Sequence, residues 1–439
     1  MSRETALQVL ISCRTRGAWA DAALQAQLRS KYLERQDAAL CSRIVYGVLQ
    51  NQLLLDYYLE SFCSQKLEHL QPPLWDILRI GAYQILFLDK VPDSAAVNTS
   101  VELAKKHKRA QAAGLVNAVL RRLAQSKEDL PPLPDKDPLK NLSIRYSHPR
   151  WLVKRLISLV GQEEAEAFMA CGNSQPPTTV QVNTCKVSTP SLLASLAEAG
   201  VTAEPHPWLP DCLLLQGTGE LERLEAFRAG GFYVQDPAAR MAVMAAGIKP
   251  HSWVLDMCAA PGGKSFAAGI LMKDRGEILS CDLHGGKLKR IQEGAARLGL
   301  TCLRTAAADG RVFNQAWSRQ FDVVLADVPC SGLGIIRKKP DIRYKRSNDL
   351  FALPVIQRTI LETAARYVRP GGTLLYSTCT ILPEENQEVT GGFLAEHPEY
   401  APAPFTLPGP VGECAGEVTL WPQRHGTDGF YICRMTRQG

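Results

Sequence analysis

Residues 253–264 read Trp-Val-Leu-Asp-Met-Cys-Ala-Ala-Pro-Gly-Gly-Lys, an apolar strand that runs into a glycine turn. Four further apolar runs follow at 278–282, 302–305, 321–327 and 372–377. Helical segments, notably 287–298 and 353–368, intervene. Apolar strands that alternate with helices predict a parallel α/β sheet, in which ligands bind at the carboxyl ends of the strands. The residues that follow each run are therefore the first candidates for a functional site.

The chain before this sheet divides into an all-helical part and a small mixed part. Apolar residues recur at helical spacing over 3–125, which predicts an all-α domain over 1–130. Four prolines lie between 131 and 138, so 131–140 is predicted to be a linker. A helix at 151–169, strands at 178–183 and 212–215 and a helix at 191–199 predict a small α+β subdomain over 141–240. The α/β domain then covers 241–439.

Composition limits the class of protein. The 439 residues include 50 Lys and Arg, 44 Asp and Glu, and 46% apolar residues, which is typical of a chain with several globular domains. No run reaches the roughly 18 apolar residues that span a bilayer. The thirteen cysteines form no C-x-x-C pair, so neither a zinc site nor a disulfide framework is expected. We expect a cytoplasmic protein with reduced thiols, no metal and no membrane partner.

Acidic residues follow the strands of the predicted sheet. Asp256, Asp282 and Asp327 end three strands, and Asp309 follows the weak strand at 302–305. The turn after Asp256 lets a ligand approach the backbone, with a helix N-terminus behind it. Asp282 is placed to bind ribose hydroxyls, and Asp309 to meet an adenine edge. A single Asp here is more often a cap or loop residue, but four together favour an adenosine-containing cofactor.

The turn itself narrows the choice of cofactor. The dinucleotide pattern G-x-G-x-x-G is absent. The ending Gly263-Lys264-Ser265 fits a P-loop, but Cys258 stands where that loop requires glycine. Pro261 also removes an N–H that should bind phosphate. S-adenosylmethionine, which has no phosphates, fits better than ATP, so a P-loop ATPase is the less favoured alternative.

Two cysteines each follow a strand of the predicted sheet. Cys330 comes after the strand at 321–327, and Cys379 after the strand at 372–377. If these strands are neighbours about 4.8 Å apart, both thiols lie at the rim of one pocket. A single cysteine is usually a small buried hydrophobe, and eleven of the thirteen are expected to be so. Two thiols beside a cofactor loop favour chemistry over packing.

Cytosine C5 methylation is the reaction that needs such an arrangement. C5 is a poor nucleophile until a thiolate adds at C6 and makes C5 enamine-like. An acid at the ring nitrogens, for which Asp327 is the candidate, would stabilise the developing charge. A base must then remove the C5 proton so that the thiol can leave. Two cysteines can divide addition and release between them, whereas N- or O-methylation needs no thiol.

Several longer stretches together resemble RNA cytosine-5 methyltransferases. They are Cys258–Lys264, Asp327–Gly332, Arg337–Arg343, Ser377–Thr380 with Glu385-Asn386, and Asp428–Tyr431. The helical first domain, with Arg43–Gly47 and Leu55-Asp56, is similar to the NusB-type RNA-binding domain. The resemblance covers essentially the whole chain. It implies that the last domain is a Rossmann-like, class I S-adenosylmethionine-dependent methyltransferase domain.

The resemblance also implies the roles of individual residues. Cys379 would be the nucleophile, Cys330 would aid product release, and Asp327 would act beside them. Spacing alone does not assign the thiol roles, because DNA cytosine methyltransferases carry the nucleophile in a Pro-Cys motif. The residues implied to contact S-adenosylmethionine are Cys258, Ala259, Ala260, Pro261, Gly262, Gly263, Lys264, Asp282, Asp309 and Asp327.

Basic residues give the expected RNA contacts. The run 337–346 follows the Cys330 loop and holds six cations against Asp341, so a polyanion partner is favoured over a merely solvated face. Tyr344 within it could stack on a base of the unpaired RNA that this chemistry requires. The residues expected to bind RNA are Arg337, Lys338, Lys339, Arg343, Lys345, Arg346, Lys105 and Lys106.

The resemblance implies 16S ribosomal RNA as the substrate, before the small subunit is fully assembled, and we expect the protein to act as a monomer. A different class of function is a non-catalytic RNA-binding assembly or antitermination factor that retains a cofactor fold. The intact cofactor loop and both thiols argue against that alternative.

Overall fold

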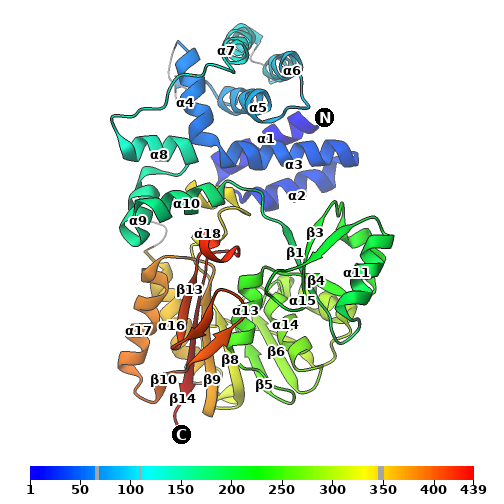
Figure 1. The fold of residues 1–439 in the computed structure, drawn as a ribbon, viewed down its shortest axis with the longest axis vertical. Coiled ribbons are helices and arrows are strands. Elements are labelled where there is room, and N and C mark those ends of the chain that lie inside the picture. Colours follow the sequence, from blue (N-terminus) through cyan, green and yellow to red (C-terminus); the bar gives the residue numbers. More distant parts are fainter. Residues whose placement is uncertain (65–68, 108–109, 345–350) are drawn as a thin grey trace. The chain divides into compact units, whose positions relative to one another are not determined.

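The computed structural model describes residues 1–64, 69–107, 110–344 and 351–439 (Figure 1). The chain forms two compact units, one made of Met1–Gln175 with Ile336–Lys345 and the other of Pro176–Ile335 with Arg346–Gly439. We call them the helical unit and the catalytic unit, the second after the candidate catalytic residues that the sequence analysis places in it. None of the helices in the described ranges combines the length and the apolar character needed to cross a bilayer.

The helical unit is built around α5 (Leu74–Phe87), eleven of whose fourteen residues are buried. A helix buried on all sides must be enclosed by other helices. Gly47 allows α3 to touch it, because a Cβ at that position would lie 1.9 Å from Cζ of Tyr83. The other helices of this unit are α1 (Ser2–Arg16), α2 (Ala20–Lys31), α3 (Arg35–Gln50), α4 (Gln52–Phe62), α6 (Asp93–Lys106), α7 (Ala113–Gln125), α8 (Pro138–Tyr146), α9 (Arg150–Val160) and α10 (Gln162–Gly172).

The end of the helical unit differs from the sequence prediction. Residues 141–175 belong to the helical unit, whereas the prediction began a separate subdomain at 141. Pro138 starts α8 inside the predicted linker, because proline is tolerated in the first helical turn and Asp137 caps it by accepting from the Lys140 N–H at 3.0 Å. The single helix predicted at 151–169 is two, since Gly161 adopts a positive φ of 81° between them.

The catalytic unit begins with a small antiparallel sheet of order β2-β3-β1-β4. Its strands β1 and β3 coincide with the predicted runs, while the short strands β2 and β4 were not predicted. Leu192 and Leu196 of α11 pack on Val180 and Leu213 of the sheet to form its core. The elements are β1 (Thr178–Val182), α11 (Thr189–Glu198), β2 (Thr202–Pro205), β3 (Cys212–Gln216), α12 (Glu225–Arg228) and β4 (Phe232–Val234).

The main sheet of this unit has eight strands in the order β10-β14-β9-β8-β5-β6-β7, with β13 beside β14. The five strands from β5 to β9 are parallel, as predicted, and β14 pairs antiparallel with β9. The strands are β5 (Trp253–Asp256), β6 (Glu277–Asp282), β7 (Leu303–Ala307), β8 (Phe321–Asp327), β9 (Val368–Thr378), β10 (Tyr400–Pro402), β13 (Glu417–Leu420) and β14 (Phe430–Arg437). Strands β11 (Phe405–Leu407) and β12 (Gly412–Cys414) form a separate ribbon.

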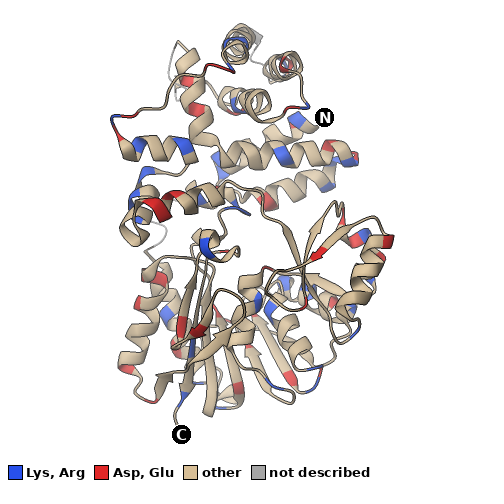
Figure 2. Cartoon of the chain, viewed as in Figure 1, with Lys and Arg blue, Asp and Glu red and all other residues tan. Residues whose placement is uncertain are grey.

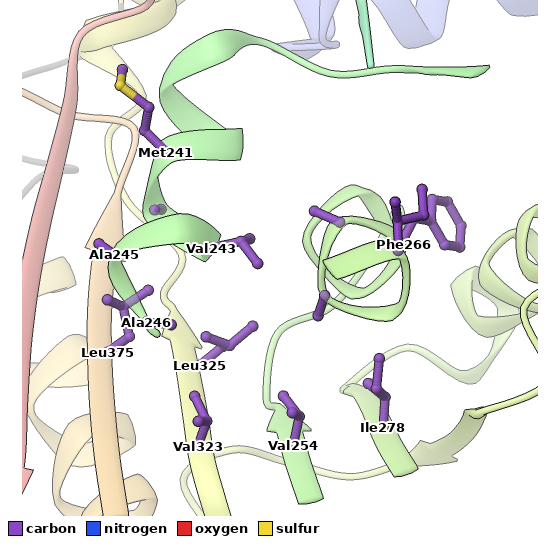
Figure 3. Packing of buried hydrophobic residues seen from close by; sticks show 14 of the residues in the cluster. Met241, Val243, Ala245, Ala246, Val254, Phe266, Ile278, Val323, Leu325 and Leu375 are labelled. Carbon is purple, nitrogen blue, oxygen red and sulfur yellow. The ribbon is translucent and has the colours of Figure 1, made fainter. Parts of the chain in front are cut away.

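Helices cover both faces of the main sheet. Val323 and Leu325 face a core shared with α13 and α14 (Figure 3). Val324 and Ala326 face a core shared with α16 and α17. This alternation explains why residues 323–326 of this strand are all apolar. The helices are α13 (Pro237–Ala245), α14 (Gly263–Leu271), α15 (Gly285–Leu298), α16 (Leu353–Ala365), α17 (Gln387–Glu396) and α18 (Pro422–His425).

Candidate active site

The strand order of the main sheet fixes the place of the candidate site. Chain order runs outward from β5 to β6 and β7 on one side, and from β8 to β9 on the other. Ligands bind where the order of a parallel sheet reverses, outside the carboxyl ends of the strands. The turn Cys258–Lys264 after β5 and the loop Val328–Cys330 after β8 therefore flank the expected ligand position.

The two cysteines meet at this edge. Asp327 of β8 lies opposite Ser377 of β9, and the Sγ atoms of Cys330 and Cys379 are 3.3 Å apart. The pKa of the Cys330 thiol lies well above its usual range, because the thiol is hydrogen-bonded to Cys379 and is buried near Glu385. The raised pKa favours the protonated thiol at Cys330, and either sulfur can be the donor in this contact.

Lys264 and Asp327 form an ion pair at the same edge. Nζ of Lys264 lies 2.6 Å from Oδ2 of Asp327, whose Oδ1 accepts from Ser377 Oγ at 2.8 Å. Burial alone would lower the pKa of Lys264, but the charge and hydrogen bond of Asp327 outweigh burial and raise it. The ammonium group also lies 5.1 Å from the ring centre of Phe430. This lysine stays charged and holds the Asp327 carboxylate in one orientation.

Asp256 provides a second carboxylate below the glycine turn. Its Oδ2 accepts from Ser265 Oγ at 2.7 Å, and its buried Oδ1 has no partner within the protein. Burial raises the pKa of Asp256 to about 6. Gly262 in the turn adopts a φ of 111°, a backbone conformation that favours glycine. An unpartnered buried carboxylate oxygen suits a positively charged ligand.

The acidic residues around the turn fit S-adenosylmethionine, whose sulfonium and amino groups are cationic. Asp256, Asp282 and Asp327 all lie at carboxyl ends of neighbouring strands. Three carboxylates would repel the phosphates of a nucleotide, which agrees with the lack of a P-loop glycine at Cys258. Burial and the neighbouring carboxylates raise the pKa of the Cys258 thiol, which disfavours its thiolate form. Among the described residues, no group of three or more His, Cys, Asp or Glu is arranged to hold a metal ion.

Asp282 and Asp309 lie near one another at the ends of β6 and β7. The Ala308 N–H donates to the Asp282 carbonyl at 3.2 Å, and Asp282 Oδ1 accepts from the His284 N–H at 2.9 Å. Asp309 is bound by both arms of Arg311, at 2.9 and 2.6 Å, which lowers its pKa to about 2. Its charge is thus already paired, an interaction that the sequence analysis did not foresee.

Arg343, which the sequence analysis predicts to bind RNA, is buried inside the helical unit and has no exposed surface. Its guanidinium donates to the carbonyls of Gln50, Tyr146, Ser147 and Gly172 at 3.1 to 3.3 Å, and to Asn173 Oδ1 at 2.8 Å. Tyr344, the predicted stacking residue, donates its hydroxyl to the Leu49 carbonyl at 2.9 Å. The basic run from 337 therefore contributes to the structure of the helical unit.

The other residues predicted to bind RNA lie in ion pairs, are half-buried, or fall outside the described residues. Lys339 pairs with Asp21 at 3.0 Å, Lys105 with Glu102 at 2.8 Å, and Lys106 with Glu4 at 3.4 Å. Arg337 and Lys338 are half-buried, and both take part in interactions. Lys345 and Arg346 lie outside the described residues. Lys and Arg are mixed with Asp and Glu over the helices of this unit (Figure 2).

Two groups of functional side chains were missed by the sequence analysis. Ser377 orients Asp327 and stands two residues before Cys379. Its position beside a candidate catalytic residue could have marked it in the sequence. Gln357 on α16 touches the Cys330 loop through the Pro329 carbonyl at 3.0 Å, and no local pattern marks it. The motif Glu385-Asn386 was noted only as part of the family resemblance, without a role.

Comparison with known proteins agrees with these features. Family models described as "16S rRNA methyltransferase RsmB/F", "NusB family" and "Methyltr_RsmF/B-like, ferredoxin-like domain" match residues 243–436, 1–125 and 148–222. The chain is 38% identical to the probable ribosomal RNA small subunit methyltransferase B of Bacillus subtilis, over 100% of this chain and 99% of that protein. It is 34% identical to the probable enzyme of the same name from Synechocystis, over 99% of each. The crystal structure of PH0851 superposes with a TM-score of 0.80 at 28% identity, over 98% of each chain.

Proposed function

Because this chain belongs to the ribosomal RNA small subunit methyltransferase B family and is therefore an S-adenosylmethionine-dependent methyltransferase, we propose that it methylates C5 of a cytidine in 16S ribosomal RNA. The observation that carries the proposal is the 3.3 Å approach of Cys330 and Cys379 beside the Lys264–Asp327 pair. Two thiols in contact beside a cofactor turn serve a reaction with separate addition and release steps.

The bound cofactor supplies an electrophilic methyl group, and the protein makes the cytosine able to accept it. The Cys379 thiolate adds to C6, and the electrons of the C5–C6 double bond become available at C5. C5 then forms its bond to the methyl carbon as the methyl–sulfur bond of the donor breaks. A base then takes the C5 proton, the electrons of that C–H bond restore the C5–C6 double bond, and the C6–sulfur bond breaks to release the Cys379 thiolate.

The geometry of the two thiols supports a distinct role for each cysteine. Cys330 keeps its proton, so it can hydrogen-bond to Cys379 sulfur when that sulfur carries charge. The same thiol lies next to the C6 adduct and can aid the release of the product. Burial and contact with the partner sulfur keep Cys330 from competing as the nucleophile.

The Lys264–Asp327 pair is proposed to act on the edge of the base. Addition at C6 places negative charge on the ring, which is stabilised by a proton donated toward the ring nitrogens. Lys264 carries the proton of this pair, and its Nζ lies 2.6 Å from Oδ2 of Asp327. Asp327 is thereby held by Lys264 and Ser377, so it needs little reorientation when the base arrives.

The substrate and setting are part of the proposal. The relatives named above are ribosomal RNA small subunit methyltransferases, and a stacked cytosine cannot be reached by Cys379. We infer that the enzyme acts as a monomer, on 16S RNA that is not yet fully assembled with protein. Free thiols are needed for catalysis, which favours the reducing cytoplasm.

The test is methylation of 16S ribosomal RNA from a strain that lacks the corresponding activity. The protein is incubated with that RNA and a methyl-labelled donor, and the RNA is digested to nucleosides. The proposal predicts label in 5-methylcytidine, and Cys379→Ala should remove the label while leaving cofactor binding in place. Label in an N-methylated base, or unchanged activity of the Cys379 variant, would refute it.

A further inference from the structure

We propose that the adjacent residues Glu385 and Asn386 are positioning residues with separate tasks, Glu385 holding the turn that carries Cys330 and Asn386 holding the turn that carries Cys379. The inference rests on the proposed function, which gives the two thiols different steps. It assigns a role to a motif that the reaction chemistry did not use.

Glu385 reaches both sides of Cys330. Its side chain is buried, and its Oε2 accepts from the Ser331 N–H at 2.8 Å and from Gln357 Nε2 at 2.8 Å. The same amide nitrogen of Gln357 donates to the Pro329 carbonyl at 3.0 Å. The residue before Cys330 and the residue after it are thus held through one carboxylate oxygen.

Asn386 does the same for Cys379. Its Oδ1 accepts from Thr378 Oγ1 at 2.6 Å, and its Nδ2 donates to the Thr380 carbonyl at 3.1 Å. Asn386 is also buried, so water cannot replace either bond without opening the loop. Both neighbours of Cys379 are therefore fixed by a single amide.

The backbone that carries these two side chains is itself anchored. The Tyr376 hydroxyl donates to the Glu385 carbonyl at 2.6 Å, and the Thr390 N–H donates to the Asn386 carbonyl at 3.0 Å. Truncating either side chain leaves these backbone bonds in place. The two turns also contact one another through Ser331 Oγ and Thr380 Oγ1 at 2.7 Å, which aligns them without either side chain.

Loss of the two side chains should therefore slow different steps of the reaction. Without the Glu385 carboxylate, the turn that carries Cys330 loses the hydrogen bonds of Ser331 and Gln357 to that side chain. The turn that carries Cys379 keeps its two hydrogen bonds to Asn386. Addition to C6 should proceed, and release should be at least about tenfold slower, as expected when two buried hydrogen bonds are lost. Without the Asn386 amide, Cys379 itself is displaced, so addition should be slowed by a similar factor.

The experiment incubates full-length variants with 16S RNA and donor and resolves covalent protein–RNA adducts on a denaturing gel. Glu385→Ala should accumulate adduct as Cys330→Ala does, and Asn386→Ala should form little, as Cys379→Ala does. Glu385→Gln retains an oxygen that can accept both hydrogen bonds, so it should behave almost as wild type. Glu388→Ala removes an exposed glutamate three residues away and serves as the matched control. Melting temperature and donor affinity establish that each variant is folded.

Two results would overturn the division of tasks: no adduct with Glu385→Ala when Cys330→Ala shows one, or adduct accumulation with Asn386→Ala. A second measurement does not depend on the reaction. Alkylation by iodoacetamide, followed by peptide mass spectrometry, should change rate at Cys330 alone in Glu385→Ala and at Cys379 alone in Asn386→Ala. If Cys330→Ala forms no adduct, the proposed release step fails, and the alkylation rates still decide whether the positioning roles hold.

Discussion

Replacing Arg343 by methionine tests whether the basic run after Cys330 is structural. The side chain keeps a similar length but loses every donor. Five acceptors lose a partner: four backbone carbonyls at 3.1 to 3.3 Å and Asn173 Oδ1 at 2.8 Å. All of these bonds lie in the helical unit, so the substitution should lower the stability of that unit.

The magnitude follows from the geometry. A hydrogen bond to a charged group contributes about 1.5–3 kcal/mol, and breaking a buried charged network costs about 3–5 kcal/mol. Part of this is offset, because burial of the guanidinium without a carboxylate is itself unfavourable and lowers the pKa of Arg343 to about 10. We expect Arg343→Met to lower the free energy of unfolding by about 3 kcal/mol, and the melting temperature by about 6–12 °C.

The assay combines calorimetry with hydrogen exchange, which should show faster exchange at residues 146–148 and 172–174. Lys339→Met is the matched control from the same segment, because its half-exposed pair with Asp21 is worth only about 0–1 kcal/mol. RNA affinity of the folded Arg343 variant should be close to wild type. A stability change below about 0.5 kcal/mol together with a clear loss of RNA affinity would refute the structural role.

Further predictions concern the catalytic unit. Lys264→Met should slow methyl transfer about 10–100-fold in single-turnover assays, because Asp327 loses a hydrogen bond worth about 1.5–3 kcal/mol. The control is Lys287→Met, which removes an exposed lysine 3.6 Å from Asp282 and should have little effect. The ionised form of Asp256 predominates only above about pH 6. The affinity for S-adenosylmethionine, measured by calorimetry, should therefore fall up to about tenfold per pH unit below that value. In Asp256→Asn the affinity should no longer depend on pH in this range. Gly334→Ala should lower activity and stability, by at least about 1–3 kcal/mol, because its Cβ would lie 1.9 Å from the Gly429 carbonyl oxygen. Gly286→Ala, whose Cβ meets nothing within 4 Å on α15, should instead raise stability by about 0.5–1 kcal/mol.

Most of the main sheet could be predicted from sequence because its strands are buried on both faces. The runs at 253–256 and 321–327 match β5 and β8, since residues 254–255 and 323–326 alternate between two cores and are all apolar. The short strands β2 and β4 have only three or four residues, too few for a period to emerge. The division at 175 was also missed, because it depends on which helices pack together and not on where prolines lie.

The candidate site was predictable where it depends on strand ends and not where it depends on packing. Asp327, Cys330 and Cys379 follow adjacent strands, so a parallel sheet brings them together. The burial of Arg343 could not be read from a run of cations, because only the tertiary fold provides the five acceptors that surround it. Likewise, Gln357 joins the Cys330 loop from a helix distant in sequence.

The most direct measurement is peptide mapping of the covalent complex that Cys330→Ala forms with a short 16S RNA fragment and the methyl donor. If the two sulfurs act on one extruded base as proposed, mass spectrometry will locate a methylated cytidine on the peptide that contains Cys379, and Cys379→Ala will yield no such peptide. A nucleotide attached to any other residue, or a complex that survives the loss of Cys379, would contradict the account.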